Sequence, residues 1–148
     1  MERELYMRRA LALAREAMDA GEVPVGCVII DADGRIVGAG RNRREERKDA
    51  TAHAETEAIR AACAALGTWH LTGCTMFITL EPCPMCAGAI IMARIPTLVF
   101  GAREAQTGSC GSVIDLFAER YGHSPAVYPN VLADESAALL REFFRGKR

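Results

Sequence analysis

The chain has 148 residues, of which 50% are hydrophobic and 25% are charged, and its formal net charge is −1. This length and composition predict one domain over residues 1–148 with an ordinary hydrophobic core, and they exclude a disordered or fibrous chain. Balanced charge argues against a protein that coats nucleic acid through its overall charge. The apolar stretches are too short to span a bilayer and the first residues are charged, so we expect a cytoplasmic protein without a membrane anchor.

The first third of the chain predicts a helix followed by a hairpin. Apolar residues at helical spacing predict a helix over Glu4–Ala20. Two strands, Val23–Ile30 and Arg35–Gly40, flank the turn signal Asp31–Gly34 and are typical of a β-hairpin. The charged segment Arg41–Ala50 is predicted to be a polar loop.

The rest of the chain alternates helices and strands. Thr51 is predicted to cap a helix that ends near Leu66. Strands that are separated by helices pair in parallel, so we expect a three-layer α/β/α sandwich on a central mixed sheet. The later elements are a strand over Thr75–Leu80, a helix over Pro84–Arg94, a strand over Thr97–Gly101, a loop over Gln106–Gly111 and a helix over Ala133–Phe144.

One histidine and two cysteines form the most informative chemical pattern. His53 lies at the start of one predicted helix, and Cys83 and Cys86 form a Cys-x-x-Cys pair at the start of another. Both helices follow sheet segments, so all three side chains are expected at one end of the sheet. A helix N-terminus also lowers the pKa of thiols and favours anionic ligands. Three protein ligands leave one tetrahedral position of Zn²⁺ open, which is typical of a catalytic site.

Glu55 is the acid that completes this pattern. Residues two apart do not face each other on a regular helix, so Glu55 can share a site with His53 only because both lie in the first turn. A zinc-bound water becomes a nucleophile near neutral pH, and a neighbouring carboxylate can carry its proton to a leaving group. His-x-Glu followed by Pro-Cys-x-x-Cys is the signature of zinc deaminases, so the pattern indicates hydrolytic deamination.

Two other interpretations of the cysteines are weaker. A structural zinc site needs a fourth ligand, and neither His70 nor His123 lies at a ligand-like spacing. A thioredoxin-like redox pair would leave His53 unexplained. Cys27 and Cys63 lie in apolar segments and are predicted to be buried small hydrophobic residues.

The residues around these motifs resemble the bacterial tRNA-specific adenosine deaminases. The resemblance implies a cytidine deaminase-like fold and conversion of adenosine to inosine at the wobble position of the tRNA anticodon stem-loop. It implies one zinc ion per subunit, held by His53, Cys83 and Cys86, with Glu55 as the proton shuttle, and it implies a homodimer. It rests on Glu22–Gly26, Asn42, Thr51–Glu55, Thr79–Cys83, Met85–Ala89, Gly101–Arg103, Thr107–Gly108, Gly111–Ser112 and the segment from Val131–Glu135 through Phe143–Phe144.

The same resemblance implies a set of substrate-binding residues. Asn42 matches an asparagine that contacts the base, and Val25 and Gly26 match a strand start that lines the pocket. Many relatives have Asp where Glu104 stands, so the carboxylate extends one methylene further in this chain. The full set comprises Val25, Gly26, Asn42, Ala54, Glu104, Phe143, Phe144 and Arg145.

Zinc chemistry alone leaves the substrate open, because pocket shape decides which base enters. A free-base or nucleoside deaminase, of the guanine or cytosine type, would use the same scaffold. The basic aromatic segment Phe143–Arg148 and the loop at Asn42 favour tRNA over a free base. A non-catalytic RNA-binding subunit would be expected to lose the shuttle residue, and Glu55 is present.

Overall fold

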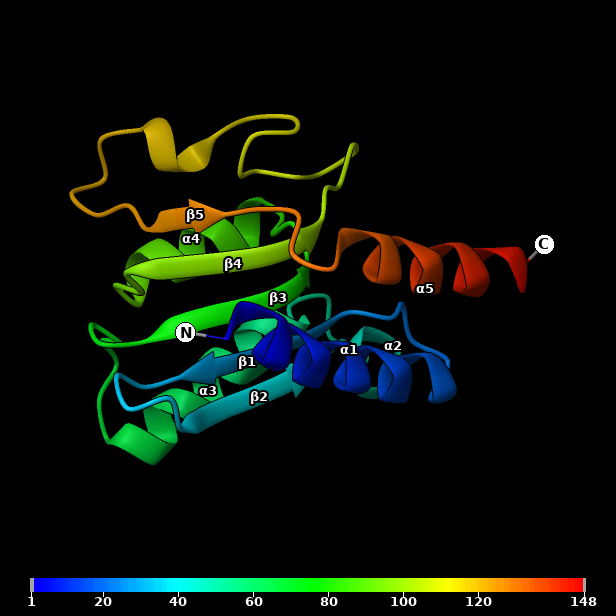
Figure 1. Cartoon of the computed structure of the whole chain (residues 1–148), viewed down its shortest axis with the longest axis horizontal. Coiled ribbons are helices and arrows are strands. Elements are labelled where there is room, and N and C mark those ends of the chain that lie inside the picture. Colours follow the sequence, from blue (N-terminus) through cyan, green and yellow to red (C-terminus); the bar gives the residue numbers. More distant parts are fainter. Residues whose placement is uncertain (1, 148) are drawn as a thin grey trace.

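The computed structural model describes residues 2–147, and its centre is a five-stranded mixed sheet with helices on both faces (Figure 1). The strand order is β2-β1-β3-β4-β5; β1 is antiparallel to β2 and β3, whereas β3, β4 and β5 are parallel. The predicted α/β sandwich on a mixed sheet is confirmed. In chain order the elements are α1 (Arg3–Asp19), β1 (Gly26–Ile30), β2 (Ile36–Arg41), α2 (Arg44–Arg47), α3 (Ala54–Leu66), β3 (Thr75–Leu80), α4 (Pro84–Met92), β4 (Thr97–Ala102), the 3-10 helix η1 (Leu116–Ala118), β5 (Ala126–Tyr128) and α5 (Ala133–Arg145).

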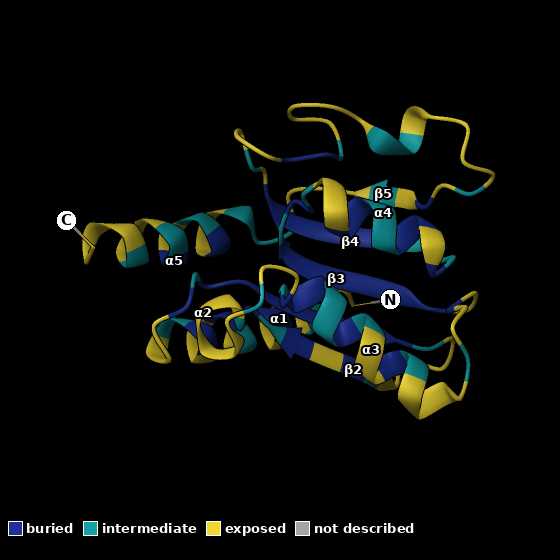
Figure 2. Ribbon diagram, turned by 180° about the vertical axis from the view of Figure 1, so that it is seen from behind, coloured by how far each residue is buried: buried dark blue, intermediate teal, exposed yellow. Residues whose placement is uncertain are grey.

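The inner strands are buried on both faces, which gives the protein two apolar cores (Figure 2). Alternate residues of a strand point to opposite faces, so Val28 and Phe77 pack against α1 while Ile29 and Ile78 pack toward α3 and α4. Burial on both faces explains the nearly continuous apolar runs of these strands. Within residues 2–147, the helices lack the combination of length and apolarity that crossing a bilayer requires.

One edge of the sheet collects the segments that carry the motifs. Because β1 runs antiparallel to its neighbours, it begins at the same edge at which β2, β3 and β4 end. Helices α3 and α4 follow β2 and β3 in the chain. His53 and Cys83, the residues that directly precede these two helices, are therefore brought together at this edge.

The start of α3 differs from the prediction. Thr51 does not cap the helix, because Asp49 Oδ1 accepts hydrogen bonds from both its backbone N–H and its hydroxyl and holds it in a preceding turn. The helix begins at Ala54, and the Thr56 hydroxyl accepts a hydrogen bond from the backbone N–H of His53. His53 thus stands one position outside the helix.

Three elements are absent from the sequence prediction: α2, the 3-10 helix η1 and β5. The predicted loop Arg41–Ala50 contains the short helix α2, whose first backbone N–H groups are capped by a distant side chain. The carboxylate of Glu22 accepts hydrogen bonds from the N–H groups of Glu45 and Glu46 at 3.1 and 2.7 Å. Strand β5 is a three-residue edge strand that pairs only with β4. Neither α2 nor β5 has a local sequence signal, because each depends on a partner far along the chain.

Gly26 allows α1 to pack directly on β1, and this contact can be tested. A Cβ added at Gly26 would lie 2.0 Å from the carbonyl oxygen of Ala10 in α1. We expect Gly26→Ala to lower the free energy of unfolding in urea by at least ~2 kcal/mol, because the helix must move outward.

Gly73→Ala is the matched control, because a Cβ at Gly73 would meet no atom within 4 Å. We expect that variant to stay within ~0.5 kcal/mol of the parent. Equal stability of the two variants would show that the contact between α1 and β1 tolerates a larger residue.

Candidate metal centre and active site

His53, Cys83 and Cys86 meet at the edge where β3 ends. Nδ1 of His53 lies 3.8 Å from Sγ of Cys83 and 3.5 Å from Sγ of Cys86, and the three donor atoms all lie within 4.8 Å of one another. His53 and Cys83 directly precede the first turns of α3 and α4, whereas Cys86 lies inside α4 and is fully buried. Two helix N-termini therefore carry all three donors, as the sequence predicts.

The donor set has the chemistry that zinc prefers. A hydrogen bond with the Cys86 thiol, aided by one with His53, lowers the pKa of Cys83 to about 4 against the opposing effect of burial. The hydrogen bond to Cys83 in turn raises the pKa of His53. One imidazole nitrogen and two sulfurs, with a thiolate favoured at Cys83, form a donor set that suits Zn²⁺.

The described part of the chain offers no fourth protein ligand. No other histidine, cysteine or acidic residue of residues 2–147 joins the cluster. His123 points elsewhere, because its Nε2 lies 2.8 Å from the carbonyl oxygen of Ile95, just before β4 begins. An open position in the coordination sphere distinguishes a catalytic zinc site from a structural one.

Glu55 is buried beside the metal ligands. Only 4% of its surface is exposed, and no ion pair holds its carboxylate within residues 2–147. Burial raises the pKa of Glu55 to about 7. Glu55 lies in the first turn of α3, whereas His53 precedes the helix in an extended conformation with φ −84° and ψ 160°. That break from helical geometry lets residues two apart reach one site.

One cavity of about 290 Å³ contains His53, Glu55 and Cys83. Its size is at the lower limit of ligand pockets and suits a single base rather than a stretch of nucleic acid. Its wall is formed by residues at the start of β1 and at the ends of β2, β3 and β4, and α5 adds one aromatic ring. The lining comprises Val23, Val25, Asn42, Arg44, His53, Ala54, Glu55, Leu80, Glu81, Cys83, Glu104, Gln106, Thr107 and Phe144.

Five of the eight predicted substrate-binding residues line this cavity: Val25, Asn42, Ala54, Glu104 and Phe144.

The other three, Gly26, Phe143 and Arg145, do not line it. Gly26 faces α1, as the close approach to Ala10 shows. Phe143 packs edge-on against Phe144 and lies under the Lys147 ammonium, 5.1 Å from its ring centre. Arg145 is the last residue of α5, and Arg148 of the predicted tail lies outside the described residues.

Sequence reasoning did not assign six of the lining residues. Leu80 and Glu81 directly precede the Pro-Cys-x-x-Cys motif, so their position in the chain was a usable signal. Arg44 lies in one predicted loop, and Gln106 and Thr107 lie in another. The sequence of neither loop indicates which side chains face the cavity. Val23 is the sixth.

Asn42 holds the wall of the cavity as well as lining it. Its Nδ2 donates to the carbonyl oxygen of Val23 at 3.5 Å, and its Oδ1 accepts from the backbone N–H of Arg44 at 3.2 Å. Only 6% of the residue is exposed. The side-chain amide therefore connects the segment before β1 to the start of α2.

Glu81 is a second buried carboxylate in the lining, with 2% of its surface exposed. Burial acts to raise the pKa of Glu81, but hydrogen bonds from the Ser112 side chain and from the backbone of Glu104, Ser112 and Cys110 outweigh it and lower the pKa. Glu81 is therefore held as a carboxylate, in contrast to Glu55.

Comparison with known proteins identifies relatives over most of the chain. Residues 1–102 match the cytidine and deoxycytidylate deaminase zinc-binding region. The tRNA-specific adenosine deaminase of Bacillus subtilis is 44% identical over 98% of this chain and 90% of its own length. The tRNA(Ile)-lysidine synthase of Deinococcus deserti is 51% identical over 96% of this chain, but the chain spans only 27% of that protein.

Two solved structures are similar in fold and sequence. One comes from studies of A-to-I editing by tRNA:A34 deaminases at the wobble position of transfer RNA; it has a TM-score of 0.87 and 43% identity, over 91% of this chain and 98% of that one. The guanine deaminase of Bacillus subtilis has a TM-score of 0.69 and 39% identity, over 85% and 80% of the two chains. With the His53, Cys83 and Cys86 cluster in place, these matches show that the chain belongs to the cytidine and deoxycytidylate deaminase zinc-binding family.

Proposed function

We propose that this protein hydrolyses adenosine to inosine at the wobble position of tRNA. The observation that carries the proposal is the base-sized cavity that contains buried Glu55 together with His53 and Cys83, two of the three zinc donors. The similarity to a tRNA-specific adenosine deaminase over nearly the full length of both chains supports tRNA as the substrate class.

The residues of the cavity account for the steps of a hydrolytic deamination. Zinc, when held by His53, Cys83 and Cys86, would supply an acidic water with a pKa of ~7. Glu55 accepts a proton at its carboxylate and delivers it to the amino nitrogen of the base. A C–O bond forms at C6 of adenine, the C–N bond breaks, and ammonia leaves. Burial keeps bulk water from competing for the proton that Glu55 carries.

The surroundings of the cavity support a polynucleotide substrate. A cavity for one base requires the adenosine to leave its stack, and single-stranded loops allow this at low cost. Phe144 is 54% exposed yet borders the cavity, so its ring can stack against a base. Arg44 adds a guanidinium at the border, where a phosphate group can approach.

A guanine deaminase is the second candidate, because the guanine deaminase of Bacillus subtilis has a similar fold and sequence. The two candidates separate in one assay. Purified protein is incubated with an anticodon stem-loop that carries adenosine at the wobble position, and in parallel with free guanine, cytosine and adenosine. We expect inosine in the stem-loop and little ammonia from the free compounds; turnover of guanine alone would support the second candidate.

Phe144→Ala tests the contact with RNA. We expect KM for the anticodon stem-loop to rise ~5- to 150-fold, because stacking one base on an aromatic ring contributes about 1–3 kcal/mol. Zinc content and the free energy of unfolding are expected to change little, since the ring is largely exposed. Tyr121→Ala is the control, because Tyr121 is a similarly exposed aromatic residue that does not line the cavity. Equal KM values for the two variants would remove Phe144 from the substrate site.

Cys86→Ala tests the assignment of the metal ligands. We expect the purified variant to retain only a small fraction of the zinc found in the parent, measured by elemental analysis, because two donors hold zinc far less well than three. Cys63→Ala is the control, since Cys63 is a free cysteine outside the cluster. Full zinc occupancy in Cys86→Ala would overturn the ligand set.

Glu55→Gln tests the proton carrier. The amide has nearly the same shape as the carboxylate but cannot accept the proton, so we expect kcat to fall at least ~10²-fold with zinc retained. Glu57→Gln is the control in the same helix, because Glu57 pairs with Arg43, Arg47 and Arg60 and does not line the cavity. A zinc-loaded Glu55→Gln with normal turnover would show that another group moves the proton.

Helix α4 supports a homodimer, which we propose as the functional form. Its sequence Pro84–Met92 contains no charged residue, and Met92 is 69% exposed. Met85 is exposed as well, and a Cβ added at Gly88 would meet no atom within 4 Å. A helix that is apolar on all sides is normally covered, and an uncharged face can pair with its own copy.

The six free cysteines support a reducing, cytosolic compartment.

Met92→Glu tests this interface. Two copies of the charge would meet near the proposed two-fold axis, so we expect light scattering to give the mass of a dimer for the parent and of a monomer for the variant. Leu5→Glu is the control, because Leu5 is a similarly exposed apolar residue on α1, across the sheet. A parent that is monomeric at micromolar concentration would contradict the proposal.

A further inference from the structure

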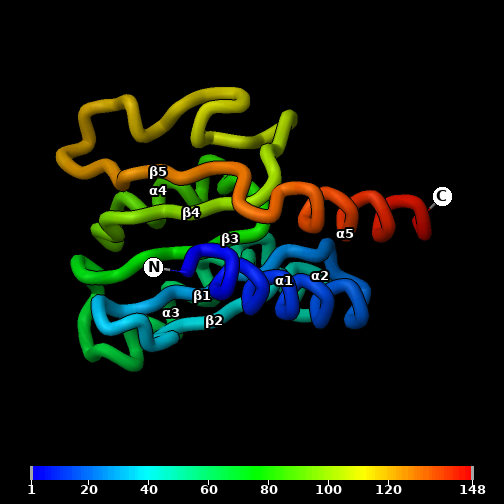
Figure 3. Tube along the Cα trace, in the orientation of Figure 1, coloured from blue at the N-terminus to red at the C-terminus, as the bar shows by residue number. Residues whose placement is uncertain are grey.

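One wall of the cavity is built by a segment with little regular structure of its own. After β4 the chain leaves the sheet and returns only at β5, and between them the described chain has no element longer than η1 (Figure 3). The first part of this excursion, Arg103–Ser112, places Glu104, Gln106 and Thr107 at the cavity. Apart from an isolated β-bridge between Cys110 and Asp115, this segment lacks helix or strand hydrogen bonds, so it needs another anchor to keep its shape.

The carboxylate of Glu81 is that anchor. Its Oε1 accepts the backbone N–H of Glu104 at 3.0 Å and the hydroxyl of Ser112. Its Oε2 accepts the backbone N–H groups of Cys110 and Ser112 at 3.0 and 3.1 Å. Each oxygen thus receives two donors, and all four donors come from Arg103–Ser112. A buried carboxylate with this many donors is strongly held, because leaving any one of them unpaired is costly.

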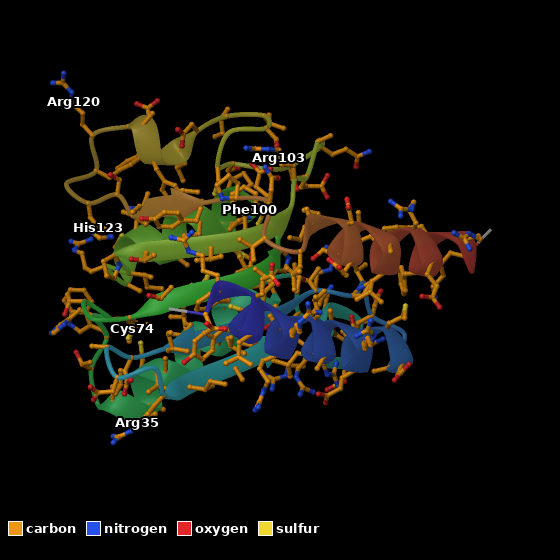
Figure 4. All side chains as sticks on the ribbon, in the orientation of Figure 1. Arg35, Cys74, Phe100, Arg103, Arg120 and His123 are labelled. Atoms are coloured by element: carbon orange, nitrogen blue, oxygen red, sulfur yellow. The ribbon has the colours of Figure 1, made fainter. Side chains whose placement is uncertain are left out.

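The segment also packs closely around this carboxylate. A Cβ added at Gly108 would lie 2.5 Å from Cδ of Glu81 and 2.4 Å from the carbonyl oxygen of Glu104, so only glycine fits. The N–H of Ser109 donates to the carbonyl oxygen of Pro82 at 2.9 Å. At the start of the segment the guanidinium of Arg103 lies 5.6 Å from the ring centre of Phe100 (Figure 4).

We propose that Glu81 is a positioning residue that sets substrate affinity by holding Arg103–Ser112 in place as a wall of the cavity. The proposal rests on the proposed deamination of tRNA. Both carboxylate oxygens of Glu81 are occupied by the segment, so the residue acts through Glu104, Gln106 and Thr107 rather than on the substrate itself. Its place two residues before Cys83 ties this wall to the strand end that carries the metal ligand.

Glu22 offers a matched comparison on the opposite wall. It is as deeply buried, and it likewise accepts two backbone N–H groups, those of Glu45 and Glu46 in α2. Replacing either glutamate by glutamine keeps the size of the side chain but turns an NH₂ group toward N–H donors. Each variant should therefore loosen only its own wall.

The test combines amide hydrogen exchange with kinetics. In Glu81→Gln we expect the amides of Glu104, Cys110 and Ser112 to exchange at least ~10-fold faster, with the amides of β3 and β4 unchanged. We expect KM for the anticodon stem-loop to rise at least ~10-fold, kcat to stay within ~3-fold, and zinc content to match the parent. Glu81→Asp keeps the charge, so its amide exchange rates and its KM should return part of the way to the parent values. In Glu22→Gln the faster amides should be those of Glu45 and Glu46.

Gly108→Ala disturbs the same contact without changing Glu81, and it keeps the test decisive if Glu81→Gln folds poorly. It should reproduce both the faster exchange and the higher KM. Ser112→Ala is a second such variant, because it removes the hydroxyl that donates to Glu81. Parent-like amide exchange and a parent-like KM in both variants would overturn the proposal. If the parent itself does not deaminate the stem-loop, the proposed function fails, whereas the exchange data still show whether Glu81 holds the segment.

Discussion

The close packing of α3 against β2 is the contact on which the site depends. Cβ atoms added at Gly38 and Gly40 would lie 2.4 and 2.6 Å from the carbonyl oxygens of Ala58 and Ala54, so the helix backbone rests directly on the strand. This contact fixes where α3 begins, and with it the extended residue His53. Since α4 begins at the same sheet edge, the imidazole meets the two thiols, and the hydrogen bonds with Cys86 and His53 favour the thiolate form of Cys83.

Two buried glutamates with different hydrogen-bond partners serve different purposes in the same cavity. Glu81 accepts four donors and stays charged, which suits a group that holds a segment in place. Glu55 lacks such a set of hydrogen-bond donors within residues 2–147, and burial raises its pKa. This suits a group that must exchange a proton. The surroundings, rather than the residue type, distinguish the proposed anchor Glu81 from the proposed proton carrier Glu55.

The metal ligands could be predicted from the sequence because their spacing is local. Cys83 and Cys86 are separated by one helical turn, and His53 precedes a helix, so both patterns are visible without a fold. The burial of Glu55 was not visible in this way, and its nearness to His53 depends on the extended backbone before α3. The expectation that both residues lie in the first turn was wrong for His53, which stands just outside it.

The walls of the cavity could not be predicted, because their hydrogen bonds join distant parts of the chain. Glu22 lies more than twenty residues before the amides that it caps, and Glu81 lies a similar distance before those that it anchors. Adjacent rings are equally ambiguous: Phe143 and Phe144 have the same chemistry, and only the orientation of α5 decides that Phe144 reaches the cavity. Composition and hydrophobic periodicity do not indicate which distant residues will contact each other.

X-ray absorption spectroscopy of the zinc-loaded protein tests the proposed ligand set, because it counts the sulfur and nitrogen donors around the metal. A site built from His53, Cys83 and Cys86 with one open position predicts two sulfurs at ~2.3 Å, one imidazole nitrogen at ~2.0 Å and one further oxygen or nitrogen donor from outside the protein cluster. A zinc ion bound by three or four sulfurs, or by four protein donors, would contradict the account.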